Sequence, residues 1–164
     1  MNDFFSKTDL SRKDAEGIIS ETLNKCDDGE LYLENSKSES IMLDDNKIKS
    51  SSYSSDLGYG LRAVTGEVVA YSHSNEISKN SLKRSADNLS STLKSKKGIY
   101  NHEIPKTNEK FYENINPIES KSLNSKLELL KEVNNYTRAK GSIVQQVTAS
   151  FAGEHKSCLL YTSP

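Results

Sequence analysis

The stretch DLGYGLRAVTG, residues 56–66, decides the fold because it supports two opposite interpretations. Residues 58–63 satisfy G-x-G-x-x-(G/A), the phosphate-binding fingerprint of dinucleotide-binding folds. In those folds the glycine turn opens directly into a helix whose N-terminus faces the pyrophosphate. Here the residues after Gly60 have the pattern of a strand and a turn, and no helical pattern begins before Asn75. We therefore interpret residues 57–64 as a strand whose glycines mark a bulge or a close backbone approach.

Strand patterns continue on both sides of this stretch. Upstream, apolar and polar residues alternate over parts of residues 31–43, and the sequence Asp-Asp-Asn at 44–46 predicts a turn. Residues 48–53 then predict a second, weakly apolar strand. Downstream, residues 65–66 predict a tight turn, and residues 68–72 predict the returning partner strand. Short strands joined by turns between neighbours predict an antiparallel meander.

A first helix is predicted over about residues 9–26. Thr8 or Ser11 is suited to cap its start, and Gly29 is suited to a left-handed stop beyond its end. Five apolar residues recur at helical spacing and predict one buried stripe. They are Ala15, Ile18, Ile19, Leu23 and Cys26. Because Cys26 closes this stripe, we interpret it as a small core residue and not as a nucleophile.

Two further helices are predicted, over about residues 75–96 and 119–140. Gly98 and Gly141 follow them as stop signals. Each helix has an apolar stripe that we expect to face the core, because neither stripe lasts the three heptads of a coiled coil. The stripes are Leu82, Ala86, Leu89 and Leu93 in the first, and Leu123, Leu127, Leu130 and Val133 in the second.

A last clear strand follows the third helix, where Ile143, Val147, Ala149 and Phe151 alternate with polar neighbours. Residues 99–118 form a polar connection that contains two prolines. The sequence therefore predicts an α+β fold, with a mostly antiparallel sheet packed by about three amphipathic helices.

The composition excludes several classes of protein. The chain has 164 residues, which is the size of one domain or slightly more, and 34% of them are hydrophobic. A formal net charge of −1 gives no electrostatic reason to expect nucleic-acid binding. The apolar runs are too short for a membrane-spanning helix, and the N-terminus does not have the pattern of a signal peptide. The two cysteines do not form a disulfide framework, so we expect a cytoplasmic protein without a membrane partner.

The residue types provide no complete catalytic or metal site. The three histidines, His73, His102 and His155, are too far apart to form a local ligand pair. His102 and Glu103 begin an H-E-x-x-H motif, but Lys106 stands where the second histidine is required. No G-x-S-x-G motif occurs.

The charged clusters have local structural explanations. The acidic pairs at 27–28 and 44–45 lie at a helix end and a turn. The lysine run at 94–97 lies at a helix C-terminus, where it favourably meets the helix dipole. We therefore assign no catalytic and no metal-binding residue, and we expect no cofactor in this chain; the substrate-binding residues stay unknown.

Several segments resemble, in order, the N-terminal part of the TldD/PmbA family of zinc metallopeptidases, also called modulators of DNA gyrase. They are GELYLENSKSESIMLDDNKIKSSSYSSDLGYGLRAVTGEVVAYSHSNEIS at 29–78, FYENINPI at 111–118 and VQQVTASFAG at 144–153. The resemblance spans about residues 9–153 and looks closer to the TldD branch. Its most specific piece is G-x-G-x-R-x-x-x-G together with the following YSHSNEIS.

The resemblance implies a cytoplasmic peptidase for peptides and unfolded polypeptides, which usually pairs with a PmbA-type partner subunit as a heterodimer or forms a homodimer. The family's zinc ligands lie in a later histidine–glutamate–x–x–x–histidine helix and at a cysteine, and none of these residues is present here. We expect a non-catalytic N-terminal domain at 1–153, in which residues 119–153 lead toward a missing catalytic part. Its alternative is a stand-alone protein- or peptide-binding or regulatory module without catalysis.

The C-terminal residues need a separate interpretation. After Gly153 the sequence departs from the family pattern and ends in SCLLYTSP. We expect residues 154–164 to be a non-native or truncated tail, with 157–164 derived from translated adapter sequence. The alternative is a genuine edge strand formed by Cys158, Leu159, Leu160 and Tyr161.

Overall fold

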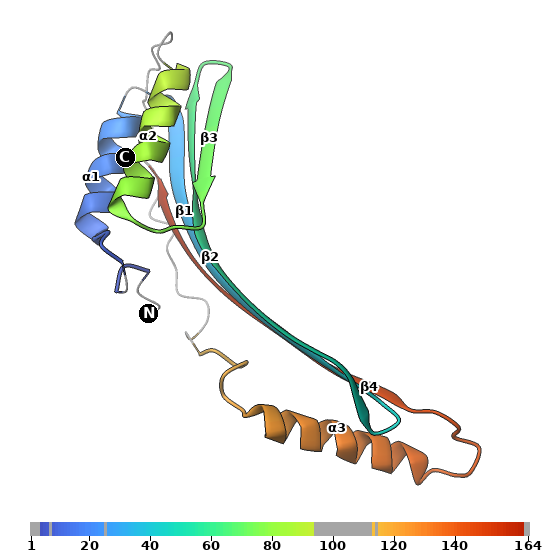
Figure 1. The fold of residues 1–164 in the computed structure, drawn as a ribbon. Coiled ribbons are helices and arrows are strands. Elements are labelled where there is room, and N and C mark those ends of the chain that lie inside the picture. The colour runs from blue at the N-terminus through green and yellow to red at the C-terminus, as the bar shows by residue number, and fades with distance from the viewer. Residues whose placement is uncertain (1–3, 7, 25, 94–112, 114, 163–164) are drawn as a thin grey trace. The chain divides into compact units, whose positions relative to one another are not determined.

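The computed structural model describes residues 4–6, 8–24, 26–93, 113 and 115–162. Three helices and four strands follow in the order shown in Figure 1. They are α1 (Arg12–Leu23), β1 (Asp28–Asp44), β2 (Lys47–Thr65), β3 (Val68–Ser74), α2 (Lys79–Leu93), α3 (Leu123–Arg138) and β4 (Thr148–Thr162). This arrangement confirms the predicted α+β class. None of the helices in the described residues is long and apolar enough to cross a membrane.

The four strands form one antiparallel sheet in the order β3-β2-β1-β4. Strands β1 and β2 are joined at Asp45 and Asn46, which have positive φ values of 47° and 65°. This is the turn that the sequence Asp-Asp-Asn predicts, because these residue types tolerate the left-handed region. Gly66, with a φ of 59°, turns β2 into β3, and the pairing runs from Thr65 opposite Val68 to Tyr59 opposite Ser74.

Strand β2 corrects the prediction of two separate strands at 48–53 and 57–64, because it is continuous over 19 residues. Side chains on both of its faces are exposed from Lys47 to Leu57. A strand without a buried face has no apolar alternation, so the sequence pattern weakens there although the backbone pairing continues.

The chain divides into two compact units. Unit 1 comprises residues 1–35, 56–113 and 157–164, and unit 2 comprises residues 36–55 and 114–156, each within the described parts of the chain. Strands β1, β2 and β4 each pass from one unit into the other. Helices α1 and α2 belong to unit 1, and α3 belongs to unit 2.

Unit 1 contains the larger apolar core, in which α1 and α2 pack together on the sheet (Figure 1). Its buried members come from both helices and from β1, β2 and β3. They include Ala15, Ile19, Leu23, Leu31, Leu33, Leu61, Ala63, Leu82 and Leu89. A buried hydroxyl cluster lies within it: the Tyr59 hydroxyl is 2.9 Å from Ser81 Oγ and 2.8 Å from Ser85 Oγ. These bonds allow α2 to bury two serines.

Helix α1 is shorter than predicted at both ends. Ser11 is its N-cap, and the Ser11 side chain accepts a hydrogen bond from the backbone N–H of Asp14. The prediction that Gly29 stops this helix is wrong, because Gly29 lies in β1 and the helix ends at Leu23. A Cβ on Gly29 would lie 2.4 Å from Leu23 Cδ2, so the glycine instead allows Leu23 to pack against the strand.

The described part of helix α2, Lys79–Leu93, lies inside the predicted span. Ser78 Oγ accepts a hydrogen bond from the backbone N–H of Ser81, and Asp9 Oδ1 accepts one from the backbone N–H of Lys79. The predicted stripe of Leu82, Ala86, Leu89 and Leu93 is buried, which confirms it as a core face. The predicted helix end at Gly98, the connection up to residue 112 and the lysine run at 94–97 lie outside the described residues.

Helix α3 corrects the predicted stripe in unit 2. Leu130 is buried as expected and Leu127 is partly buried, but Leu123 and Val133 are 52% and 44% exposed. The face that is buried comprises Lys126, Leu130 and Asn134. The true core face therefore contains two polar residues, which an apolar pattern does not detect.

Strand β4 begins later and continues further than predicted. Ile143 is 88% exposed and precedes the strand, whereas Val147 and Ala149 are buried. The strand continues to Thr162, where Leu159 and Tyr161 pack against the core of unit 1. The structure thus contains the edge strand of the alternative interpretation, while the native or non-native origin of residues 157–164 stays a prediction.

Candidate functional site

The strongest candidate for a binding site is a groove in unit 2 between α3 and the first residues of β4. Its volume is about 440 Å³. Its lining comes from one face of α3 and from the chain that enters β4, and none of its residues carries a charged side chain. They are Leu129, Leu130, Val133, Thr137, Gln146, Val147, Thr148, Ala149, Ser150 and Phe151.

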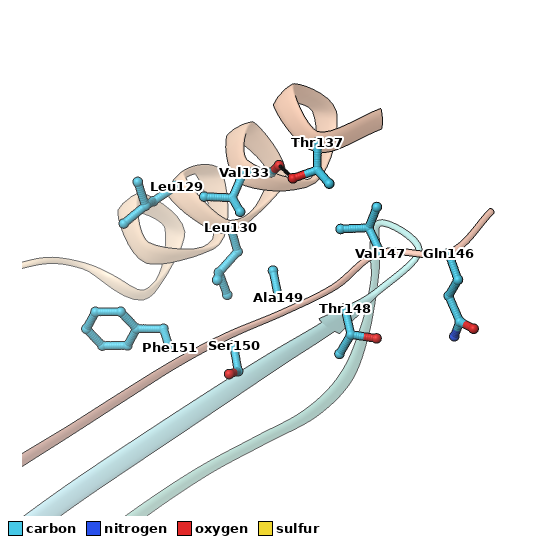
Figure 2. A pocket seen from close by; sticks show the side chains of 10 residues that line it. All are labelled: Leu129, Leu130, Val133, Thr137, Gln146, Val147, Thr148, Ala149, Ser150 and Phe151. Atoms are coloured by element: carbon cyan, nitrogen blue, oxygen red, sulfur yellow. Dashed lines mark hydrogen bonds between the residues drawn. The ribbon is translucent and has the colours of Figure 1, made fainter. Parts of the chain in front are cut away.

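Side chains alternate along the strand wall of the groove. In Figure 2, Val147 and Ala149 point toward α3, whereas Thr148 and Ser150 point to the opposite side of the strand. This is the period of two that an extended chain imposes. Leu130 of α3 points toward Ala149 in the same view.

The wall formed by α3 is apolar and only partly covered. Leu129 and Val133 are 50% and 44% exposed. They lie four residues apart and hence on one side of the helix, next to the buried face that contains Leu130. The apolar surface of α3 therefore extends beyond the face of the helix that is buried.

A buried lysine fixes the start of α3. Lys126 forms an ion pair with Glu39 of β1, and the two side chains are 6% and 11% exposed. The Lys126 ammonium also donates to the carbonyl oxygen of Ile118 at 2.6 Å and lies 5.6 Å from the centroid of the Phe151 ring. Lys126 thus connects the helix, β1 and the groove-lining strand β4 within unit 2.

The acidic turn at the end of β1 holds residues 146–148, which line the groove. Asp44 Oδ1 accepts hydrogen bonds from Gln146 Nε2 at 2.8 Å and from Thr148 Oγ1 at 3.1 Å. These donors, Gln146 first and then Thr148, hold the pKa of Asp44 below its usual value. Asp45 accepts a hydrogen bond from the backbone N–H of Val147 at 3.0 Å and one from Arg138 of α3. The two carboxylates therefore have a structural role, as their turn position predicts.

The glycines of the opening stretch are not a phosphate loop. Gly58 and Gly60 lie inside β2, and β3 follows where a cofactor fold requires a helix. A Cβ on Gly58 would lie 2.8 Å from the carbonyl oxygen of Ser74, and one on Gly60 would lie 2.5 Å from the Tyr71 hydroxyl. The interpretation of these glycines as positions of close approach is confirmed.

The histidines and cysteines, the remaining candidates for catalytic or metal-binding residues, do not form a site within the described residues. His73 and His155 lie in β3 and β4, and His102 lies outside the described residues. Cys26 is buried, and this burial raises the pKa of its thiol. Cys158 is exposed. In the part of the chain that the structure describes, no three His, Cys, Asp or Glu residues are placed to hold a metal ion.

The sequence patterns found only part of the groove. Leu130 was expected to face the core, and Val147, Ala149 and Phe151 were expected to alternate in a strand; all four line the groove. Leu129 was missed, although its position next to Leu130 and four residues before Val133 is the signal of a second apolar stripe. The proximity of α3 to β4 had no signal in the sequence.

The fold and the matched segment define the class of protein. Residues 29–93 match the family model described as PmbA/TldA metallopeptidase domain 1. The fold is shared with a putative modulator of a DNA gyrase from Thermotoga maritima, at a TM-score of 0.70 and 14% identity. That match covers 92% of this chain and 34% of the other. TldE from Thermococcus kodakarensis matches with a TM-score of 0.57 and 15% identity, over 90% of this chain and 34% of that one.

Sequence relatives agree with this class. The chain is 36% identical over 135 residues to a "Metalloprotease TldD homolog" from Buchnera aphidicola of Acyrthosiphon pisum, which covers 82% of this chain and 28% of that protein. It is 32% identical over 140 residues to the homolog from Haemophilus influenzae, with the same two coverages. The chain belongs to the TldD/PmbA family. It spans little more than a quarter of the length of these relatives.

Proposed function

We propose that this chain is the N-terminal, non-catalytic part of a TldD-type zinc metallopeptidase that processes peptides and unfolded polypeptides in the cytoplasm. The observation that carries this proposal is the similarity to relatives named metalloproteases, at up to 36% identity over most of this chain but only 28% of theirs. The first-domain family match over residues 29–93 supports the same assignment.

Zinc does not fit the described residues of this chain. They bring together no group of three His, Cys, Asp or Glu side chains that could hold a metal ion. We therefore derive no catalytic step from this chain, and the proposal assigns zinc and peptide hydrolysis to the longer protein. The contribution of this domain is to bind and guide substrate and to contact a partner subunit of the PmbA or TldE type. The similarity in fold to TldE supports such a partner.

A stand-alone peptide-binding or regulatory module is the second candidate. The uncharged groove between α3 and β4 favours it, because such a groove can bind a chain without any catalytic group. The two candidates differ in whether this domain works as part of a hydrolase.

A domain exchange tests the first candidate. The matching region of the Haemophilus influenzae homolog, about 28% of that protein, is replaced by residues 9–153 of this chain. We expect the chimera to hydrolyse a dye-labelled unfolded polypeptide together with a TldE-type subunit, and to lose that activity with a chelator. A well-folded chimera that binds its partner subunit but has no activity would contradict the proposal.

Metal analysis of the isolated chain is the complementary test. We expect less than stoichiometric zinc after dialysis, and no hydrolysis of the same polypeptide. One tightly bound zinc per chain, or hydrolysis that depends on added zinc, would overturn the non-catalytic assignment.

A further inference from the structure

We draw no further inference here: the strongest candidate, the half-exposed apolar flank of α3 beside the groove in unit 2, carries nothing because no contact within the described residues shows what covers it.

Discussion

The two units of this chain are stabilised in different ways. Unit 1 has two helices over a large apolar cluster, in which residues such as Leu31, Leu61 and Leu82 are fully buried. Unit 2 has one helix over a small cluster of Ile41, Leu43, Leu130 and Ala149. It also has polar connections, of which the buried pair of Lys126 and Glu39 is the main example. Unit 1 therefore depends on apolar area, whereas unit 2 depends on a few specific polar contacts.

This difference also explains the location of the groove. A unit with a large core covers the apolar faces of its helices, as the buried stripe of α2 shows. A unit with a small core leaves part of its helix uncovered, as Leu129 and Val133 show in α3. The less complete packing of unit 2 therefore leaves the apolar surface that lines the groove.

The largest effect is expected from a cavity in unit 1. Leu82→Ala removes a side chain with 0% exposure from the core, so it should lower the free energy of unfolding by about 4 kcal/mol. Urea unfolding followed by circular dichroism measures it. The control is Leu123→Ala in unit 2, an exposed leucine whose loss should change stability by less than about 0.5 kcal/mol. Equal losses would show that unit 1 does not depend on its core in this way.

The second effect is expected from the polar connection in unit 2. Lys126→Met removes the ammonium and leaves the Glu39 carboxylate buried without its partner, at a cost of about 3 kcal/mol. Hydrogen exchange should become faster in α3 and remain unchanged in α1 and α2. The double variant Lys126→Met/Glu39→Leu should recover most of the stability, because no unpaired charge remains. A single variant as stable as the unchanged chain would show that the pair does not support unit 2.

The sequence predicted those parts of the fold in which a buried face imposes a period. Leu31 and Leu33 in β1 and the stripe of α2 are examples, and both are buried as expected. The prediction failed where this cause is absent. The exposed half of β2 has no buried face, and the core face of α3 contains Lys126 and Asn134, whose burial depends on partners distant in sequence.

The groove shows the same limit. Val147 and Ala149 follow the local period of the predicted strand, and both are buried. Their approach to Leu129 and Val133 is a tertiary contact that no local period encodes. It depends on Asp44 and Asp45, which hold the start of β4 through Gln146, Thr148 and Val147. The role of these acids as turn residues was predictable, and their role as connectors was not.

A smaller effect compares matched helix caps in the two units. Ser11 and Ser122 are the N-caps of α1 and α3, and each accepts a backbone hydrogen bond, at 3.0 and 3.2 Å. Ser11→Ala and Ser122→Ala should each cost about 1 kcal/mol. If unit 2 opens independently, Ser122→Ala should increase hydrogen exchange only in α3. An increase in α1 and α2 as well would show that the two units unfold as one.

The smallest effect is expected from acid, because the groups concerned are exposed ion pairs and hydrogen bonds. In unit 1, a hydrogen bond from Lys79 and then one from Ser11 lower the pKa of Asp14 from 3.8 to about 2. In unit 2, hydrogen bonds from Gln146 and Thr148 lower the pKa of Asp44. A carboxyl group whose folded pKa is depressed binds fewer protons in the folded state, so its contribution is complete above its unfolded pKa and decreases as the pH falls.

The urea midpoint should therefore decrease as the pH falls from about 4 toward 2, with Asp14 contributing over this whole window. Asp14→Asn should make the midpoint less dependent on pH in this range, and hydrogen exchange should locate the change in α1 and α2. Asp44→Asn should reduce the pH dependence of exchange in α3 and at the start of β4. If Asp14→Asn instead altered only α3, the assignment of separate polar contacts to the two units would be wrong.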